Sequence, residues 1–278
     1  MAALTAHKGL VLTDNIEDYP EGIIIPIDKP YRWTSADVIR KVKYAAVRHF
    51  HKKNLKVGHA GTLDPLATGV LLVCIGKATK LAEELQKHDK EYVAGVSFGA
   101  TTPSYDREKD IDRHYPLEGV SEEALRAVLP SFIGEQEQIA PLFSAKSVDG
   151  VRAYELARKE YKAAERSGEE FDHSAAELLS KQRITISEAE LLFYGHKEFE
   201  PVEGPARINV VDISGLALPH ADIRVRCSKG TYIRALARDL GEALGSGAFL
   251  DDLRRTENGN FRVEDSLNLE EVTKLLDS

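Results

Sequence analysis

The sequence predicts an α+β fold with a mostly antiparallel mixed sheet flanked by helices and insertions. Runs that alternate apolar and polar residues predict strands, and runs with an apolar residue every three or four positions predict helices. The two kinds of run do not follow a regular βαβ repeat. Because no Pro/Ser-rich linker marks a boundary, we expect an N-terminal extension at 1–21, a single domain at 22–278 and an insertion around 152–180.

The first quarter of the chain is predicted to form a strand, a helix, a loop and a second strand. Residues 22–27 are an apolar run that predicts a short buried strand. Thr34 stands three residues before Asp37, which is the spacing of a helix N-cap. Residues 57–68 are rich in small residues without periodicity and predict a structured loop, which leads into a buried strand at 69–76.

The rest of the chain carries further periodic segments separated by polar stretches. The predicted helices span 78–86, 121–129 and 233–244. The predicted strands span 92–98, 184–194, 207–213 and 222–227, of which 207–213 has the weakest pattern.

Composition, cysteine usage and the N-terminal sequence lead us to expect a cytoplasmic enzyme or binding protein. Of 278 residues, 42% are hydrophobic and 29% are charged, as in soluble globular domains. Cys74 and Cys227 lie in apolar runs without metal-ligand spacing, so we expect reduced, buried thiols. The longest uncharged apolar run, 70–75, is too short to span a membrane, and the acidic N-terminus does not resemble a signal peptide.

The net charge of −8, from 37 Lys+Arg against 45 Asp+Glu, is the opposite of the bulk composition of a nucleic-acid binder. The positive charge is nevertheless clustered, because residues 38–56 hold seven Lys/Arg, two histidines and no acid. Phosphate contact is local, so this segment predicts a basic face. A solvated helix without a partner is the alternative.

Asp64 is the first candidate for chemistry. It precedes a proline in the glycine-bounded string GTLDPLATG, which holds a carboxylate where a ligand can meet it, although a turn aspartate is the alternative reading. The wider run over 57–80, VGHAGTLDPLATGVLLVCIGKATK, closely resembles the signature of TruB-type tRNA pseudouridine synthases. In that family the aspartate of this string is catalytic.

Further strings resemble the same family and follow in its order. They are IDKP at 27–30 with Thr34 and Ser35, KEYVAGVSFGATTPSYD at 90–106, PLFSAKSVDGVRAYELAR at 141–158, CSKGTYIRALARDLG at 227–241 and LRRTENGNF at 253–261. Together they cover most of residues 22–265. The resemblance implies a pseudouridine synthase-like catalytic domain, an isomerase that converts uridine 55 in the T loop of tRNA to pseudouridine after flipping the base.

This reaction breaks the bond from uracil N1 to ribose C1′ and joins C5 to C1′, with no net redox change or hydrolysis. We therefore expect neither a cofactor nor a metal. Asp64 can act as a nucleophile or as a base on a ribose proton, and the sequence leaves both roles open. By resemblance, Arg234 pairs with the catalytic aspartate, and Asp106 shares this arginine. Tyr92 matches the tyrosine that stacks on the uracil and assists loss of the C5 proton.

The resemblance also implies residues that bind the substrate. His59 is expected to contact RNA, Tyr232 to form part of the pocket wall, Leu253 to line the uracil pocket, and Lys29 to support the active-site loop or a phosphate. Additional phosphate candidates outside the basic segment are Lys146, Arg152, Arg254 and Arg255.

About 20 residues follow Arg255, so we expect no C-terminal PUA-type domain, no dependence on a guide RNA, and a monomer that binds the T stem-loop of tRNA. The insertion around 152–180 is longer than the family leads us to expect. Two other functions remain open: a synthase that acts on another RNA, and an RNA-binding or tRNA-folding protein without catalysis.

Overall fold

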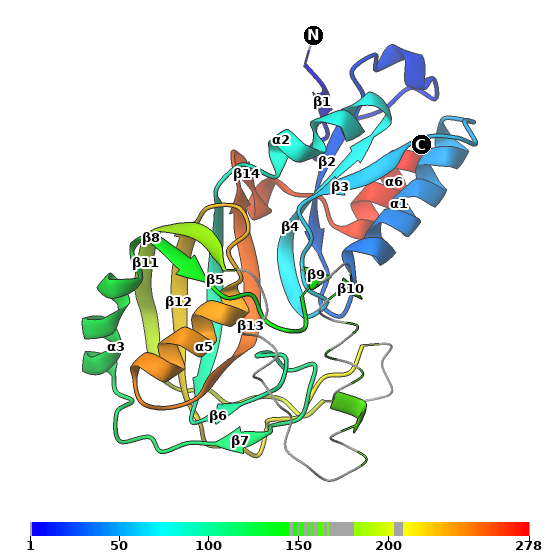
Figure 1. The fold of residues 1–278 in the computed structure, drawn as a ribbon. Helices are drawn as coiled ribbons and strands as arrows, with labels where there is room; N and C mark the ends of the chain where they lie inside the picture. Colours follow the sequence, from blue (N-terminus) through cyan, green and yellow to red (C-terminus); the bar gives the residue numbers. More distant parts are fainter. Residues whose placement is uncertain are drawn as a thin grey trace. The chain divides into compact units, whose positions relative to one another are not determined.

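The structure is a computed structural model of the chain (Figure 1). It describes residues 2–144, 181–202 and 208–277, together with single positions and runs of two or three residues between 147 and 166. By their contacts, the residues form two compact units, Met1–Tyr92 with Arg254–Ser278, and Val93–Leu253. The chain passes from one to the other within strands β5 (Lys90–Phe98) and β13 (Ala248–Asn258).

The first unit contains a sheet with the strand order β1-β2-β4-β13, in which β3 also pairs with β4, and β14 with β13. Only β1 and β2 are parallel among the pairs with a described register in this unit. Its elements are β1 (Leu4–Thr5), η1 (Ile16–Asp18), β2 (Ile23–Lys29), α1 (Ser35–His49), β3 (Val57–Ala60), β4 (Ala67–Ile75), η2 (Gly76–Leu81), α2 (Ala82–Leu85), β14 (Phe261–Arg262), η5 (Val263–Asp265) and α6 (Leu269–Asp277).

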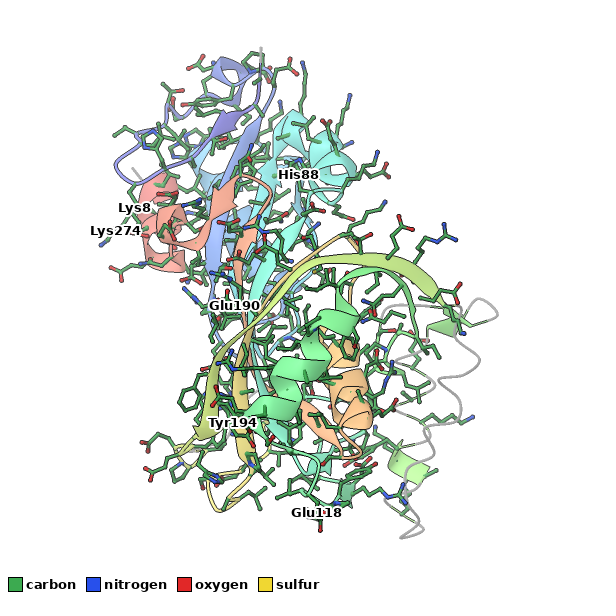
Figure 2. The ribbon with its side chains drawn as sticks, turned by 90° about the vertical axis from the view of Figure 1, so that its left-hand side faces the viewer. Lys8, His88, Glu118, Glu190, Tyr194 and Lys274 are labelled. Carbon is green, nitrogen blue, oxygen red and sulfur yellow. The ribbon has the colours of Figure 1, made fainter. Side chains whose placement is uncertain are left out.

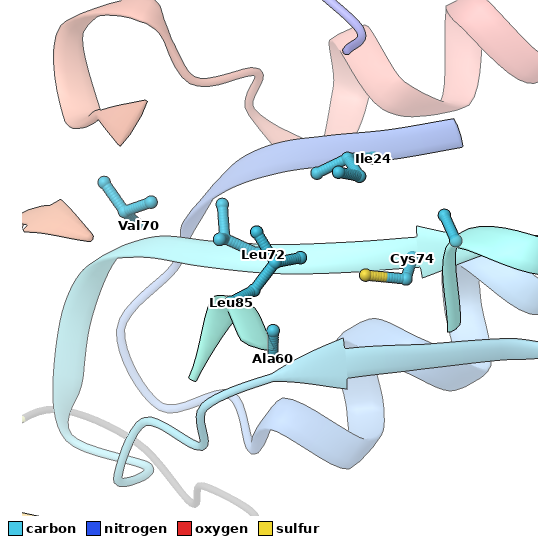
Figure 3. Packing of buried hydrophobic residues seen from close by; sticks show 7 residues of the cluster. Ile24, Ala60, Val70, Leu72, Cys74 and Leu85 are labelled. Carbon is cyan, nitrogen blue, oxygen red and sulfur yellow. The ribbon is translucent and has the colours of Figure 1, made fainter. Parts of the chain in front are cut away.

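Strand β4 is buried on both faces, as its unbroken apolar sequence VLLVCI requires. Val70, Leu72 and Cys74 pack with Ile24 and Leu85 in one cluster (Figure 3). Helices α1 and α6 lie side by side in the first unit and contact its strands (Figure 1). The sheet thereby becomes a rigid support for the loop between β3 and β4.

Helix α1 begins as its sequence predicts. The Thr34 hydroxyl accepts a hydrogen bond from Asp37 N at 3.0 Å, and the Asp37 carboxylate accepts one from Thr34 N at 3.1 Å. This reciprocal capping box satisfies two backbone donors at the start of the helix.

The second unit contains the strand order β5-β12-β11-β8 with antiparallel β11-β12 and β11-β8 pairs. Its other elements are β6 (Ala100–Thr101), β7 (Arg113–His114), α3 (Glu122–Val128), η3 (Leu129–Phe132), β8 (Gly134–Gln138), β9 (Ser147–Val148), β10 (Val151–Arg152), β11 (Gln182–His196), β12 (Pro219–Cys227) and α5 (Ile233–Ala243). Figure 2 shows β11 with Glu190 and Tyr194 along its length, and the Tyr194 hydroxyl donates to Val120 O at 3.2 Å.

The predicted α+β class with a mostly antiparallel sheet is confirmed. Cys74 and Cys227 are buried free thiols, also as predicted. No helix among the described residues is long and apolar enough to span a membrane. The division into an extension, one domain and an insertion stays a prediction, and most of the insertion lies outside the described residues.

Two predictions of local structure are wrong. Residues 57–68 were expected to form a loop throughout, but Val57–Ala60 form β3, because ladder pairing with β4 overrides their lack of periodicity. Residues 208–213, the described part of the weakest predicted strand, form no strand. The apolar side chain of Ile213 is instead buried beside Phe249, which accounts for the pattern.

Candidate active site

Asp64 lies in the short loop between β3 and β4. The two strands are antiparallel neighbours, with Ala60 opposite Leu72, so the loop reverses the chain at one end of a buried pair. Leu63 and Leu66, on either side of Asp64, are buried, whereas Asp64 itself is half-buried. The loop is thus anchored by its leucines, and Asp64 between them keeps part of its surface exposed.

Ser35, the first residue of α1, bonds to the residue just before Asp64. Its hydroxyl donates to Leu63 O at 3.1 Å and accepts from Leu63 N at 3.0 Å. Ser35 is 3% exposed, so water does not compete for these bonds. The start of α1 and the Asp64 loop are therefore joined.

Arg255 bonds to the first part of the same loop. Its guanidinium donates to Gly61 O at 3.1 Å, to Thr62 O at 3.4 Å and to Val70 O at 2.7 Å. The side chain is 1% exposed and cannot contact a phosphate in solution, so the prediction of a phosphate-binding role for Arg255 is wrong. Arg254 is half-exposed and pairs with Asp28 at 2.8 Å. Lys146 and the side chain of Arg152 lie outside the described residues.

Lys29 bonds to the loop at Pro65, the residue after Asp64. Its ammonium donates to Pro65 O at 3.2 Å, to Trp33 O at 2.6 Å and to Pro30 O at 3.0 Å. Burial lowers the pKa of Lys29 to about 8, and attraction to the Asp64 carboxylate opposes this decrease. Of the two roles predicted for Lys29, this geometry favours support of the loop.

His59 lies in β3, half-buried. Its Nδ1 is buried and has no hydrogen-bond partner among the described residues. Burial and the nearby Arg255 guanidinium lower the pKa of His59, so the ring is neutral at physiological pH. Tyr92 is the third residue of β5 and is 8% exposed. Contact of either ring with RNA stays a prediction.

The structure brings Asp106 and Arg234 together in the second unit. Arg234 Nε lies 3.6 Å from Asp106 Oδ2, and each side chain is only 7% exposed. The other guanidinium nitrogens donate to Ser104 O and Phe143 O, each at 3.1 Å. Arg234 is therefore a buried arginine held by Asp106 and two backbone carbonyls. Pairing of Arg234 with Asp64 stays a prediction, since Asp64 belongs to the first unit.

The Asp106 carboxylate is itself held in place. Its Oδ1 accepts from Ser104 Oγ at 2.6 Å and from Glu108 N at 2.9 Å. Tyr232 is the N-cap of α5, and its backbone N and O bond to the side chain of Gln138. Leu253 is 8% exposed in β13. The roles of Tyr232 and Leu253 in a uracil pocket stay predictions.

All seven Lys/Arg of the basic segment 38–56 are exposed, on α1 and the loop after it. Arg40 pairs with Asp37 and Lys52 with Glu17. Tyr44, 68% exposed on α1, has the Arg48 guanidinium 5.7 Å from its ring centre. A face of this charge with an exposed ring is suited to a polyanion that carries stacking bases.

Sequence reasoning assigned no role to Ser35 and a wrong one to Arg255. Both residues stand in strings that resemble the family, but neither residue type indicates a contact with a distant backbone. Only the folded chain reveals those contacts. Among the described residues, no group of His, Cys, Asp and Glu is arranged to hold a metal ion.

Two family models match successive parts of the region that resembles pseudouridine synthases. The model "TruB family pseudouridylate synthase (N terminal domain)" matches residues 48–201, more than half of the chain. The model "tRNA pseudouridylate synthase B C-terminal domain" matches residues 234–277.

Proteins and solved structures similar to this chain support the same family. A tRNA pseudouridine synthase B of Phocaeicola vulgatus is 48% identical over 94% of this chain and 95% of its own length. The enzyme of that name from Flavobacterium johnsoniae is 41% identical over 91% of this chain and 95% of its own length. A chain in "Crystal Structure of a Cbf5-Nop10-Gar1 Complex" has a TM-score of 0.59 at 25% identity, covering 98% of this chain and 60% of that one. This chain belongs to the TruB family of pseudouridylate synthases.

Proposed function

We propose that this protein isomerises uridine 55 in the T loop of tRNA to pseudouridine. The observation that carries the proposal is the Asp64 carboxylate in its anchored loop within GTLDPLATG, in a chain 48% identical to an enzyme named tRNA pseudouridine synthase B. Relatives of that name match over nearly their whole length, which supports the same substrate class.

In the proposed reaction, Asp64 attacks the ribose or removes a ribose proton as the bond from N1 to C1′ breaks. The uracil turns within the site and C5 bonds to C1′, which releases the Asp64 carboxylate from the ribose or is followed by return of the ribose proton. The proton on C5 is lost while N1 gains one. Arg234 is proposed to keep Asp64 ionised, and Tyr92 to stack on the base. Base extrusion costs a few kcal/mol, which stacking and phosphate contacts offset.

The phosphate contacts are proposed to come from the basic segment and from a cavity in the first unit. The cavity has a volume of about 320 Å³, and its basic lining residues are Lys52, Lys56, Lys77 and Lys80. Lys56 and Lys80 make no ion pair among the described residues, so their charges are available to an anion. A cavity with two ammonium groups that lack an ion pair favours an RNA backbone.

This lysine cavity lies at the end of β4 opposite the Asp64 loop. Asp64 precedes the first residue of β4, Ala67, whereas the cavity adjoins Gly76, after the last residue, Ile75. Eight steps at about 3.3 Å per residue separate the strand ends by about 26 Å. An RNA longer than an isolated hairpin is therefore proposed to engage both.

Release of tritium from [5-³H]uridine tests the reaction and its substrate together. We expect release from a T-loop transcript and none from ribosomal RNA fragments of similar length. The reverse result would identify a synthase for another RNA. Binding without release from any of these RNAs would favour the tRNA-folding protein.

The proposal includes a cytoplasmic location, a monomer and action without a guide RNA. Light scattering after size exclusion, with and without tRNA, tests the monomer. Tritium release by purified protein from tRNA as the sole RNA tests the absence of a guide.

A further inference from the structure

Three consecutive residues before Asp64 have backbone groups bonded to two buried side chains. The Arg255 guanidinium donates to the carbonyls of Gly61 and Thr62. The Ser35 hydroxyl accepts from the Leu63 N–H and donates to the Leu63 carbonyl. Neither side chain comes from the loop itself. The backbone that leads into Asp64 is therefore fixed from outside the loop.

The Ser35 hydroxyl serves the loop and not the helix in which it stands. The cap of α1 is supplied by Thr34, whose hydroxyl accepts from Asp37 N. Ser35 bonds instead to a residue 28 positions away, and it is the only described side chain bonded to Leu63 N–H and O. Without this hydroxyl, two buried backbone groups beside Asp64 would lose their partner.

Arg255 contributes what a lysine cannot. A guanidinium presents five N–H groups in a rigid fork, and here the fork spans carbonyls from both the loop and the adjoining strand. The contacts with Gly61 and Val70 lock the start of the loop to β4. Its burial, at 1% exposed, keeps these bonds away from water.

We propose that Ser35 and Arg255 are positioning residues that aim the Asp64 carboxylate at the reacting ribose. This inference rests on the proposed function, since it takes Asp64 as the catalytic residue. A misplacement of about 1 Å in a reacting group can reduce a rate by about 100-fold. The bonds to residues 61–63 remove the backbone freedom that would allow such a shift.

The test compares Ser35→Ala with Thr34→Ala, which removes the helix cap and leaves the Ser35 hydroxyl in place. Four quantities are measured in each: kcat for tritium release, the Kd for the same RNA, hydrogen exchange of the Leu63 amide, and the Tm. For Ser35→Ala we expect kcat to fall by about 10- to 100-fold, Kd to stay unchanged and Leu63 exchange to accelerate. For Thr34→Ala we expect a lower Tm, with the other three values as in the wild type.

Arg255→Lys provides a second, independent test of the proposal. It keeps the charge but its single ammonium cannot reach all three carbonyls, so we expect a similar fall in kcat at unchanged Kd. If this buried substitution prevents folding, Ser35→Ala alone decides. The two residues act on one loop, so the double variant should lose less than the product of the single losses.

Several results would overturn the inference. Unchanged Leu63 exchange in Ser35→Ala would mean that the hydroxyl does not hold the loop. Faster exchange with a wild-type kcat would mean that loop order does not set the activity of Asp64. An equal fall of kcat in Thr34→Ala would assign the effect to helix stability. A wild-type protein that releases no tritium would instead refute the proposed function, and Leu63 exchange would still report on the contact.

Discussion

Gly69 and Arg255 approach so closely that a β-carbon on Gly69 would lie 2.1 Å from the carbonyl oxygen of Arg255. Gly69 also has φ of +101°, a value that other residues rarely adopt. The carbonyl oxygen is part of the backbone of a sheet, so it cannot move away from a new β-carbon as the end of a flexible side chain could. The close approach brings the Arg255 guanidinium over the start of β4, where it reaches Val70 O.

Gly69→Ala should therefore destabilise the protein by about 3 kcal/mol or more, since overpacking and backbone strain act together. Urea unfolding gives the free energy. Gly58→Ala in β3 is the control, because its β-carbon would lie no closer than 3.9 Å to its nearest neighbour, and we expect a loss below about 1 kcal/mol. Equal losses in the two variants would contradict the close approach.

The lowered pKa of His59 predicts a dependence of stability on pH. In the unfolded chain the imidazole binds a proton near pH 6.5, while burial and Arg255 disfavour that proton in the folded state. The unfolded state thus binds more protons below pH 6.5, and stability is lost as the pH falls. The free energy of unfolding of His59→Gln should fall less between pH 7.5 and 5.5 than that of the wild type. Identical pH dependence would show that His59 does not contribute.

The lysine cavity predicts a salt effect on RNA binding. Removal of one phosphate-binding charge should lower the slope of log K against log salt by about 0.7 to 0.9, so Lys56→Ala combined with Lys80→Ala should lower it by about 1.4 to 1.8. The effect should be larger for full-length tRNA than for an isolated T stem-loop. Filter binding at several salt concentrations gives the slope.

Lys8 and Lys274, labelled in Figure 2, supply the matched control for that experiment. They lie in the first unit and line a different cavity, together with Leu10 and Leu275. Their joint replacement by Ala removes the same charge, and the slope should stay at the wild-type value. An equal decrease in both double variants would mean that overall charge, and not the lysine cavity, sets the salt dependence.

Tyr92 offers a test of how the C5 proton leaves. Tyr92→Phe removes only the hydroxyl, so if this group takes part in the proton transfer, kcat should fall by about 100- to 10,000-fold with RNA affinity retained. Tyr92→Leu also removes the stacking surface and should weaken RNA binding as well. Tritium release and a binding isotherm measure the two effects. A Phe variant with wild-type kcat would limit Tyr92 to stacking.

The sequence predicts this fold well where local chemistry decides it. The Thr34 cap starts α1 at Ser35, and the apolar run of β4 is buried on both faces, as its pattern indicates. Such features depend on neighbours along the chain. The predicted class of sheet follows from several of them together.

Prediction fails where long-range pairing overrides the local pattern. Strand β13, LDDLRRTEN at its charged end, has no strand-like alternation, yet it pairs within the sheet. Its Arg255 is buried and bonds to one carbonyl of β4 and two of the loop before it. A buried arginine gives no local signal of its partners. For the same reason the sequence points to Asp64 as a candidate but not to Ser35, whose role depends on a contact across 28 residues.

The most direct test of the proposed function is tritium release from a T-loop transcript by the wild type and by Asp64→Asn. The substitution keeps the size of the side chain and removes the carboxylate, which can no longer act as nucleophile or base. We expect turnover by the wild type and none by Asp64→Asn, with the Kd for RNA unchanged. Tritium release by Asp64→Asn at the wild-type rate would contradict the assignment of Asp64 as the catalytic residue.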